Sequence, residues 1–378
     1  MNVFYSKRDW FLSIPIFLIF SCNSGNQNKE FAYSEFVALD SFEVVMPAEY
    51  LQQTNWTTYK NGDKNILVEY GLFGEDELII HQLDLDEEAY VKKLKISKEG
   101  PEGFNAYDAS VYLKNEDSLY VFPMGRNSFF LYNSVGEKVN EYPYNSQNFE
   151  RYYKSSYYSS LIPLSNELIL PTINDVRYDD PDYFKKVTPI QSFNLSTSKF
   201  VDKIEYPEFI HGKYIPSLTG ATISPFDEDQ FLINYSFSDS IYIHNYKTIE
   251  TRSLYCGADY FGKPKLLDRV LNRNEQTEYA VKEVNYEAAF YHNSKIYRIV
   301  NHVTSSDYEN YSVFEILSEN RRLVSLVELN PKTGEMKYYK LPIAKYFVFQ
   351  DNVLFAGGIS VREEDAETYR RFYKYTLE

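Results

Sequence analysis

The chain has 378 residues, of which 17% are aromatic, and a formal net charge of −15 at pH 7. This charge argues against a nucleic-acid partner, because nucleic-acid binding draws its affinity from clustered Lys and Arg. It also argues against the body of the protein lying on an anionic membrane. The abundance of Tyr and Phe, together with Ile, Val and Thr, favours β-strands over helices.

The N-terminal segment has the layout of an export signal. A basic pair at residues 7–8 precedes the apolar run Phe11–Phe20, which is shorter than the roughly 20 residues that span a bilayer. The residues ending at Cys22 resemble the box of bacterial lipoproteins, in which the cysteine is lipidated and becomes the new N-terminus. A plain cleaved signal is the alternative. We expect a signal peptide over 1–21, a lipid anchor on Cys22 and a flexible polar tether over 22–34.

A degenerate repeat follows, in which an Asn, Asp or Ser precedes a short hydrophobic strand. Six copies are Lys64–Val68, Asp117–Val121, Asn166–Leu170, Asp229–Ile233, Ser294–Tyr297 and Asp351–Phe355. Their starts lie about 50 to 65 residues apart, a period that suits the four strands of a propeller blade and exceeds those of leucine-rich or ankyrin repeats. The sequence therefore predicts an all-β, six-bladed β-propeller with four-stranded blades, in one domain over 35–378.

The two ends of this domain predict how the ring closes. The run Phe372–Leu377 stops after the third strand of the sixth unit, and Phe36–Met46 is a lone strand pattern with no unit of its own. An N-terminal strand that completes the last blade would remove an open sheet edge. Two separate β-sandwiches are the alternative, although no Pro-, Gly- or Ser-rich linker divides the chain.

The leader, the mature length, the repeated strands and the turn Gly100–Phe104 resemble the six-bladed propeller lipoproteins of some Gram-negative envelopes, many of them classed only as domains of unknown function. This resemblance implies a propeller fold, a lipid anchor and an envelope location, with the outer membrane favoured. It supplies no catalytic residue.

The long insertions of the repeat are predicted to gather on one rim, because loops between second and third strands emerge beside the links between blades. They are 99–108, 142–159, 174–187, 208–222, 257–286, 304–322 and 360–370. Long loops on a rigid scaffold often bind ligands, although neutral variation in length is the alternative. Because loop length costs little free energy, we expect 257–286 to be removable without loss of the fold.

Candidate ligand-binding residues lie in or beside these insertions. The sharpest cluster is an acidic loop that contains Arg177, Tyr178, Asp179, Asp180 and Asp182. Its carboxylates could hold calcium, but their spacing does not match an EF-hand, and a solvated acidic loop is the favoured interpretation.

Three further candidates come from single residues. Arg298 lies in a predicted inner strand, where it would bind an anionic ligand in the channel or neutralise a carboxylate there. His211 and His302 lie in or next to rim loops and are the histidines we would test as acid or base. Cys256 is expected to be a small buried residue. No metal-ligand spacing or catalytic motif is present, so we expect neither metal nor cofactor, and the catalytic residues are unknown.

Three functions fit these features. The first is a lipid-anchored envelope module whose loop-rich rim holds a glycan, a peptide or a partner protein. The second is an envelope hydrolase or lyase acting on a polysaccharide or peptide, with an acid–base set in the channel mouth. The third is a structural or sensory subunit of a membrane complex. The first is favoured, and the chain is more easily read as a binding protein than as an enzyme.

Overall fold

The computed structural model describes residues 32–47, 52–73, 76–104, 106, 108–144, 150–153, 158–174, 179–216, 220–342, 344, 346–350, 353–359 and 369–376. Tyr33–Glu378 form one compact unit. The expected signal peptide and the expected anchor residue Cys22 lie outside the described residues, as does most of the insertion 360–370. No helix in the described part of the chain is long and apolar enough to cross a membrane.

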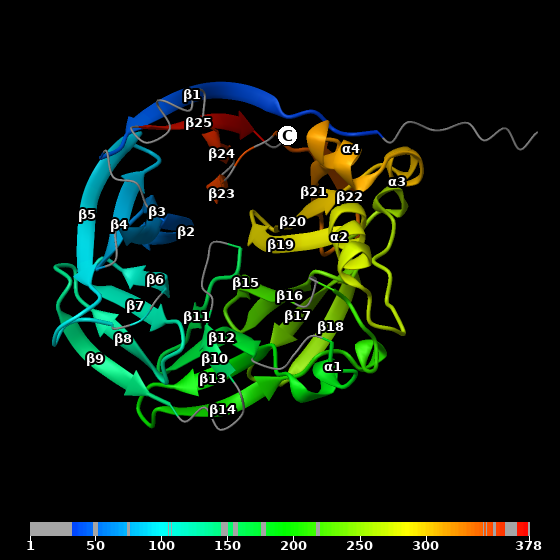
Figure 1. Ribbon diagram of the computed structural model, residues 1–378. Coiled ribbons are helices and arrows are strands. Elements are labelled where there is room, and N and C mark those ends of the chain that lie inside the picture. Colours follow the sequence, from blue (N-terminus) through cyan, green and yellow to red (C-terminus); the bar gives the residue numbers. More distant parts are fainter. Residues whose placement is uncertain are drawn as a thin grey trace, which may run out of the picture. The chain divides into compact units, whose positions relative to one another are not determined.

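Six antiparallel sheets lie around a central axis, and each is one blade of a propeller (Figure 1). Every sheet has four strands except that of blade 3, where two short strands share the innermost position, both pairing with β12. One of these, β10, lies within the segment 142–159 that was expected to be a link between blades. The predicted six-bladed, all-β fold is confirmed.

The strands of each blade run outwards from the axis in sequence order. Blade 1 contains β2 (Gln52–Asn61), β3 (Lys64–Phe73), β4 (Glu77–Asp84) and β5 (Ala89–Ser97). Blade 2 contains β6 (Ala109–Asn115), β7 (Ser118–Pro123), β8 (Ser128–Tyr132) and β9 (Lys138–Pro143). Blade 3 contains β10 (Glu150–Tyr153), β11 (Ile162–Pro163), β12 (Glu167–Asn174), β13 (Ile190–Asn194) and β14 (Lys199–Ile204). Blade 4 contains β15 (Ala221–Asp227), β16 (Gln230–Tyr235), β17 (Ser240–Asn245) and β18 (Glu250–Tyr255). Blade 5 contains β19 (Asn285–His292), β20 (Lys295–His302), β21 (Leu323–Leu329) and β22 (Met336–Lys340).

Blade 6 is built from both ends of the chain, which confirms the predicted closure. It contains β23 (Tyr346–Gln350), β24 (Val353–Ile359), β25 (Tyr369–Thr376) and, outermost, β1 (Val37–Val45). Strand β1 pairs antiparallel with β25 from Val37 opposite Thr376 to Val45 opposite Tyr369. In Figure 1 the blue β1 follows the red β25 along the edge of the ring.

Ion pairs reinforce blade 6 itself and its contact with blade 1. Arg370 of β25 donates to both carboxylate oxygens of the buried Glu69 in β3, with Nε to Oε2 at 3.0 Å and Nη2 to Oε1 at 2.6 Å. Arg371 pairs with Glu43 of β1. A bidentate guanidinium–carboxylate pair fixes geometry as well as charge, so it holds blades 6 and 1 in register.

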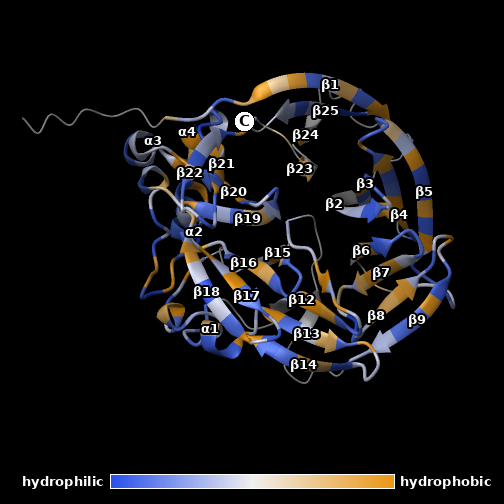
Figure 2. Ribbon diagram, turned by 180° about the vertical axis from the view of Figure 1, so that it is seen from behind, coloured by the Kyte–Doolittle hydropathy of each residue, from blue (hydrophilic) through white to orange (hydrophobic). Residues whose placement is uncertain are grey.

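The hydrophobic core lies between neighbouring blades. Val68 of blade 1 and Val121 of blade 2 belong to one fully enclosed cluster, and similar clusters join blades 2 to 3, 3 to 4, 5 to 6 and 6 to 1. The outermost strands β14 and β18 are largely exposed, whereas β16 is buried along nearly its whole length. Figure 2 shows the hydropathy of each residue along the blades. Each blade therefore contributes apolar surface to two neighbours, and burying that surface is the main stabilising term of the fold.

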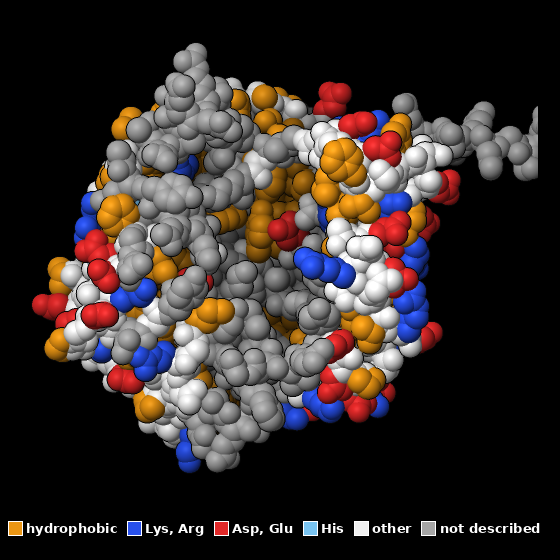
Figure 3. Space-filling view, viewed as in Figure 1, with side chains coloured by type: hydrophobic (Ala, Val, Ile, Leu, Met, Phe, Trp, Pro, Cys, Tyr) orange, Lys and Arg blue, Asp and Glu red, His pale blue; other side chains and the backbone are white. Residues whose placement is uncertain are grey.

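The antiparallel order divides the turns between two faces of the ring. The turns at 62–63, 116–117 and 293–294 lie on what we call the hairpin face, together with the turns that join the third strand of each blade to the fourth. The segments 179–187, 257–284 and 303–322 lie on the opposite face, which we call the loop face. The described long insertions thus share one face, as the sequence predicts. Acidic and basic side chains are interspersed around the described edge of the ring (Figure 3).

The insertions on the loop face form short helices that pack into a layer. The helices are α1 (Tyr183–Lys186), η1 (Glu208–Ile210), η2 (Asp259–Phe261), α2 (Arg273–Lys282), α3 (Ser305–Asn310) and α4 (Val313–Ser318). Asn272 begins α2 with a capping box, in which its side chain accepts from the backbone of Glu275. The burial of Phe261, Tyr279 and Val281 contradicts the expectation that 257–286 is a removable loop.

Candidate functional site

A cavity of about 340 Å³ lies on the axis of the ring, at the hairpin face. All six blades contribute to its wall, chiefly through their innermost strands. Its lining residues are Thr57, Thr58, Tyr59, Lys60, Asn65, Tyr112, Leu113, Lys114, Ser160, Ser224, Pro225, Phe290, Tyr291, His292 and Phe349. We call this cavity the axial pocket. Its volume falls within the range of roughly 300 to 1,000 Å³ that is usual for small-molecule sites.

Hydrogen bonds between neighbouring elements fix the wall of the axial pocket. Ser224 of β15 donates its Oγ–H to the carbonyl of Ala289 in β19 at 2.7 Å, which ties blade 4 to blade 5. Tyr59 of β2 donates to Oε1 of Gln82 at 2.8 Å, inside blade 1. Because both bonds are buried, they are not exchanged with water. The wall is therefore formed before any ligand enters.

The chemistry of the wall combines flat aromatic faces with hydroxyl and amine groups. Phe290, Tyr291 and Phe349 supply rings from blades 5 and 6, and Tyr291 packs on Phe226 with ring centroids 4.3 Å apart. Thr58 and Ser160 supply hydroxyls, while the lysines and His292 supply nitrogen. The described lining residues include no Asp or Glu. A wall of this kind can stack on a planar or ring-shaped ligand and hydrogen-bond to its edge.

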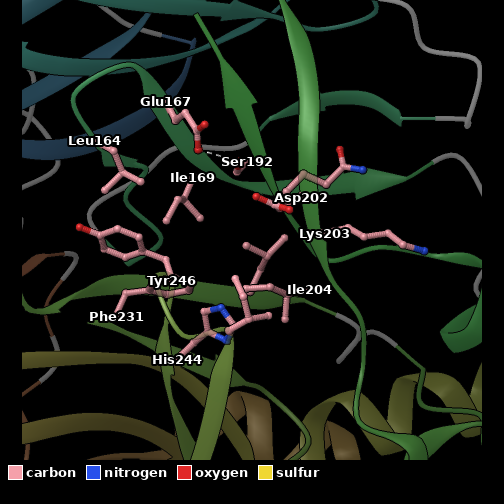
Figure 4. A pocket seen from close by; sticks show the side chains of 13 residues that line it. Leu164, Glu167, Ile169, Ser192, Asp202, Lys203, Ile204, Phe231, His244 and Tyr246 are labelled. Atoms are coloured by element: carbon pink, nitrogen blue, oxygen red, sulfur yellow. Dashed lines mark hydrogen bonds between the residues drawn. The ribbon is translucent and has the colours of Figure 1, made fainter. Parts of the chain in front are cut away.

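A second, smaller cavity of about 140 Å³ lies between blades 3 and 4. In Figure 4 the side chains of Glu167, Ile169 and Ser192 from blade 3 face those of Phe231 and His244 from blade 4. Ser192 donates to Oε2 of Glu167 at 3.1 Å. Nδ1 of His244 contacts Oγ1 of Thr251 at 2.8 Å, and burial lowers the pKa of this histidine. The side chains of Glu167, Ser192 and His244 are thus engaged in contacts within their own blades, and this crevice is smaller than the axial pocket.

The acidic loop on the loop face is described only from Asp179 onwards, so Arg177 and Tyr178 lie outside the described residues. Asp180 accepts a hydrogen bond from the backbone of Asp182 at 2.8 Å and pairs with Lys186 at 2.7 Å. The Lys186 ammonium lowers the pKa of the Asp180 carboxyl. Asp182 precedes α1 and pairs with Lys185. These carboxylates are engaged in closing the turn before α1. No group of three or more His, Cys, Asp or Glu in the described parts of the chain could hold a metal ion.

The structure places the two candidate histidines apart. His302 ends β20 and is fully buried, with Nε2 at 2.8 Å from Oγ of Ser325 and Nδ1 at 3.3 Å from the carbonyl of Val303. Burial lowers the pKa of His302 to about 4. His211 follows η1, and its Nε2 is buried with no hydrogen-bond partner among the described residues. Neither histidine lines the axial pocket.

The prediction that Arg298 lies in an inner strand and points into the channel is wrong. Arg298 belongs to β20, the second strand of blade 5, and is fully buried. Its guanidinium donates to five oxygens of blade 4 and the following link, namely Asn234 Oδ1 and the carbonyls of Tyr235, Ser238, Ser240 and Cys256. It also stacks on Tyr286, 3.8 Å from the ring centroid. The arginine joins blades 4 and 5 through these oxygens, and none of its partners among the described residues is a carboxylate.

Sequence reasoning missed the residues of the axial pocket, although a signal for three of them exists. Lys60, Lys114 and Tyr291 are each the second-last residue of the inner strand of their blade, β2, β6 and β19. Equivalent positions in a propeller repeat lie at equivalent places around the axis. Comparing this one position across the repeats would have indicated residues that line the axis.

Comparisons with known proteins place the chain in a family. The family model described as "Domain of unknown function (DUF4221)" matches residues 28–318. A crystal structure of a DUF4221 member from Bacteroides vulgatus is 16% identical, with a TM-score of 0.67 over 91% of this chain and 98% of that one. A protein of Bacteroides fragilis, named as a predicted exported protein, is 12% identical, with a TM-score of 0.53 over 91% of this chain and 95% of that one. At these identities the likeness concerns the fold alone.

The search of curated proteins gave no match. The family match covers more than half of the chain, from the tether to α4. The chain belongs to the DUF4221 family of domains of unknown function.

Proposed function

We propose that this protein is a binding module of the bacterial envelope and that it holds a short glycan in the axial pocket. The observation that supports this most is the convergence of aromatic, hydroxyl and amine side chains from all six blades on one preformed cavity. Sugar rings present an apolar face and a rim of hydroxyls, and both find partners in such a wall.

The loop face was the expected place for a ligand, and the geometry gives it less support. Of its described candidates, Asp180 and Asp182 pair with lysines of the same loop, and His302 is fully buried. These residues are not brought together around a common cavity. A peptide or partner protein on the loop face remains the competing hypothesis.

A hydrolase or lyase with its site in the channel mouth was the alternative function. Glu287, a bulged residue of the inner strand β19, accepts from Asn301 at 2.7 Å, and burial raises the pKa of its carboxyl. This carboxylate sits toward the loop-face end of β19 and does not line the axial pocket. The described residues that line the axial pocket therefore suit ligand binding better than glycoside hydrolysis, which usually needs a pair of carboxylates.

The location belongs to the same proposal. A lipid on Cys22 would hold the propeller on the outer membrane, on its periplasmic or surface side. Support comes from the residues around Cys22 and from the similarity to a protein named as a predicted exported protein.

Calorimetric titration of the purified full-length protein with neutral and acidic oligosaccharides tests the function. We expect at least one class to bind, and Tyr291→Ala to weaken that binding about tenfold by removing a stacking face. Tyr255→Ala is the matched control, because Tyr255 is exposed on the outermost strand of blade 4, far from the axis. Two results would contradict the proposal: an affinity that Tyr291→Ala leaves unchanged, or no detectable binding of any oligosaccharide in the panel.

A further inference from the structure

Two lysines at the axial pocket pair with no carboxylate among the residues that the structure describes. Lys60 is the second-last residue of the inner strand of blade 1 and Lys114 that of blade 2, and both are exposed. Neither makes an ion pair or a side-chain hydrogen bond to any residue that the structure describes. Glu116, in the turn beside Lys114, pairs instead with Lys92 at 2.9 Å. The charge of both pocket lysines is therefore available to a ligand.

Basic residues are outnumbered by acidic residues in this protein, so the position of these two lysines at the axial pocket is informative. The chain carries 54 Asp and Glu against 39 Lys and Arg, and many described lysines elsewhere pair with a carboxylate, as Lys95 does with Glu77 at 2.8 Å. At the axial pocket the balance is reversed, since Lys60, Lys114 and His292 line it and no described carboxylate does. Concave sites with one sign of charge concentrate ligands of the opposite sign.

Two of the three basic residues occupy one position of the repeat. Lys60 and Lys114 are the second-last residues of the inner strands β2 and β6, whereas His292 is the last residue of β19 and follows Tyr291, which holds that position in blade 5. Blades 1 and 2 are neighbours, which places Lys60 and Lys114 on adjacent parts of the wall. The aromatic residues Phe290 and Tyr291 lie on the wall formed by blade 5.

We infer that the axial pocket selects an anionic saccharide, with its carboxylate or sulfate held by Lys60 and Lys114 and its ring against Tyr291. This inference rests on the proposed glycan-binding function and adds the charge of the ligand to it. Lysine ammonium groups act as mobile point charges, which suits an acidic group whose position on the sugar varies. The pair is exposed, so its contribution weakens as salt screens it.

The test titrates the full-length protein with a galacturonic acid dimer, with the galactose dimer of the same linkage, and with galactose 6-sulfate. Each titration is made at about 20 mM and at about 300 mM salt, which spans Debye lengths from about 20 Å to below 8 Å. We expect the acidic dimer to bind at least about tenfold more tightly than the neutral dimer at low salt, and the difference to shrink at high salt. The sulfated sugar separates a need for a carboxylate from a need for any anion.

Variants assign the preference to the two lysines. The double variant K60Q/K114Q should reduce the preference for acid to about twofold or less while leaving binding of the neutral dimer unchanged. Lys332→Gln is the matched control, because Lys332 is exposed in the turn between β21 and β22 on the same face but away from the axis. Circular dichroism of each variant confirms that the fold is intact.

The outcomes separate this inference from the proposed function. Equal binding of acidic and neutral dimers, or a preference that survives K60Q/K114Q, overturns the anionic ligand but leaves the glycan-binding function standing. No detectable binding of any of the three sugars overturns both the anionic ligand and the glycan-binding function.

Discussion

At the scale of single residues, Arg298 is the side chain on which the contact between blades 4 and 5 depends. Its removal would leave the carbonyls of Ser238 and Cys256 buried without their donor. Arg298→Met, which keeps most of the volume, should lower the free energy of unfolding by about 3 kcal/mol or more, since each buried unsatisfied group costs roughly 1 to 3 kcal/mol. Urea denaturation measures it. Arg252→Met on the exposed strand β18 should change stability by less than about 0.5 kcal/mol, and equal effects would contradict this role.

His302 makes stability depend on pH. Its pKa is about 4 in the folded protein, because burial disfavours the charged imidazolium, against about 6.5 in the unfolded chain. The neutral ring therefore stabilises the fold fully above pH 6.5, and that contribution is lost as the pH falls toward 4. The expected loss is up to about 3 kcal/mol. Urea denaturation at pH 7 and pH 4.5 should show a smaller drop for His302→Gln than for the parent protein. Parallel drops would show that His302 does not titrate as described.

The candidate residues also show which single-residue properties can be predicted from the sequence. The burial of Cys256 was predicted and is confirmed, and burial raises the pKa of its thiol to about 11. Arg298 was assigned to the wrong strand because β19 and β20 are both largely buried, so hydrophobicity does not distinguish the first strand of blade 5 from the second. The wall of the axial pocket was missed because its residues are scattered from Thr57 to Phe349, and only the radial arrangement brings them together.

At the scale of elements, the closing strand β1 should hold the ring through its buried face. Phe42 is 8% exposed and stacks on Phe372 of β25 with centroids 5.2 Å apart, whereas Val45 on the same strand is 75% exposed. Phe42→Ala should lower the free energy of unfolding by about 3 to 5 kcal/mol, because it opens a cavity in a packed interface. Val45→Ala is the matched control and should cost less than about 0.5 kcal/mol. Thermal and urea unfolding measure both, and similar values would mean that β1 does not close the fold.

Elements were the level at which the sequence was most informative. The repeat of a polar residue before a hydrophobic strand marks the second strand of all six blades, and the lone N-terminal pattern at 36–46 was recognised as the missing outer strand. The helices of the loop face were not foreseen in this way. Segments such as 257–286 have polar residues over much of their length, but Phe261 packs on His302 and Tyr338 of blade 5, and Val281 packs with Val303 and Ile316. Such contacts join residues that are distant in sequence, so the local pattern of apolar and polar residues does not predict them.

At the scale of the whole molecule, the proposed lipid anchor on Cys22 would fix the location of the propeller. Cys22→Ala should move the protein from the membrane fraction to the soluble fraction, because the lipid would have no attachment site. Cell fractionation with detection of the chain measures this. Cys256→Ala changes the other cysteine and should leave the distribution as it was. Retention of the Cys22→Ala protein on membranes would contradict the lipid anchor.

The central claim is that six blades build one ligand site at the axis, on the hairpin face. A crystal structure of the protein with the galacturonic acid dimer tests this most directly. We predict the sugar in the axial pocket, with its acidic group against Lys60 and Lys114 and a ring face against Tyr291. A dimer bound among the helices of the loop face, with the axial pocket holding only water, would contradict the account.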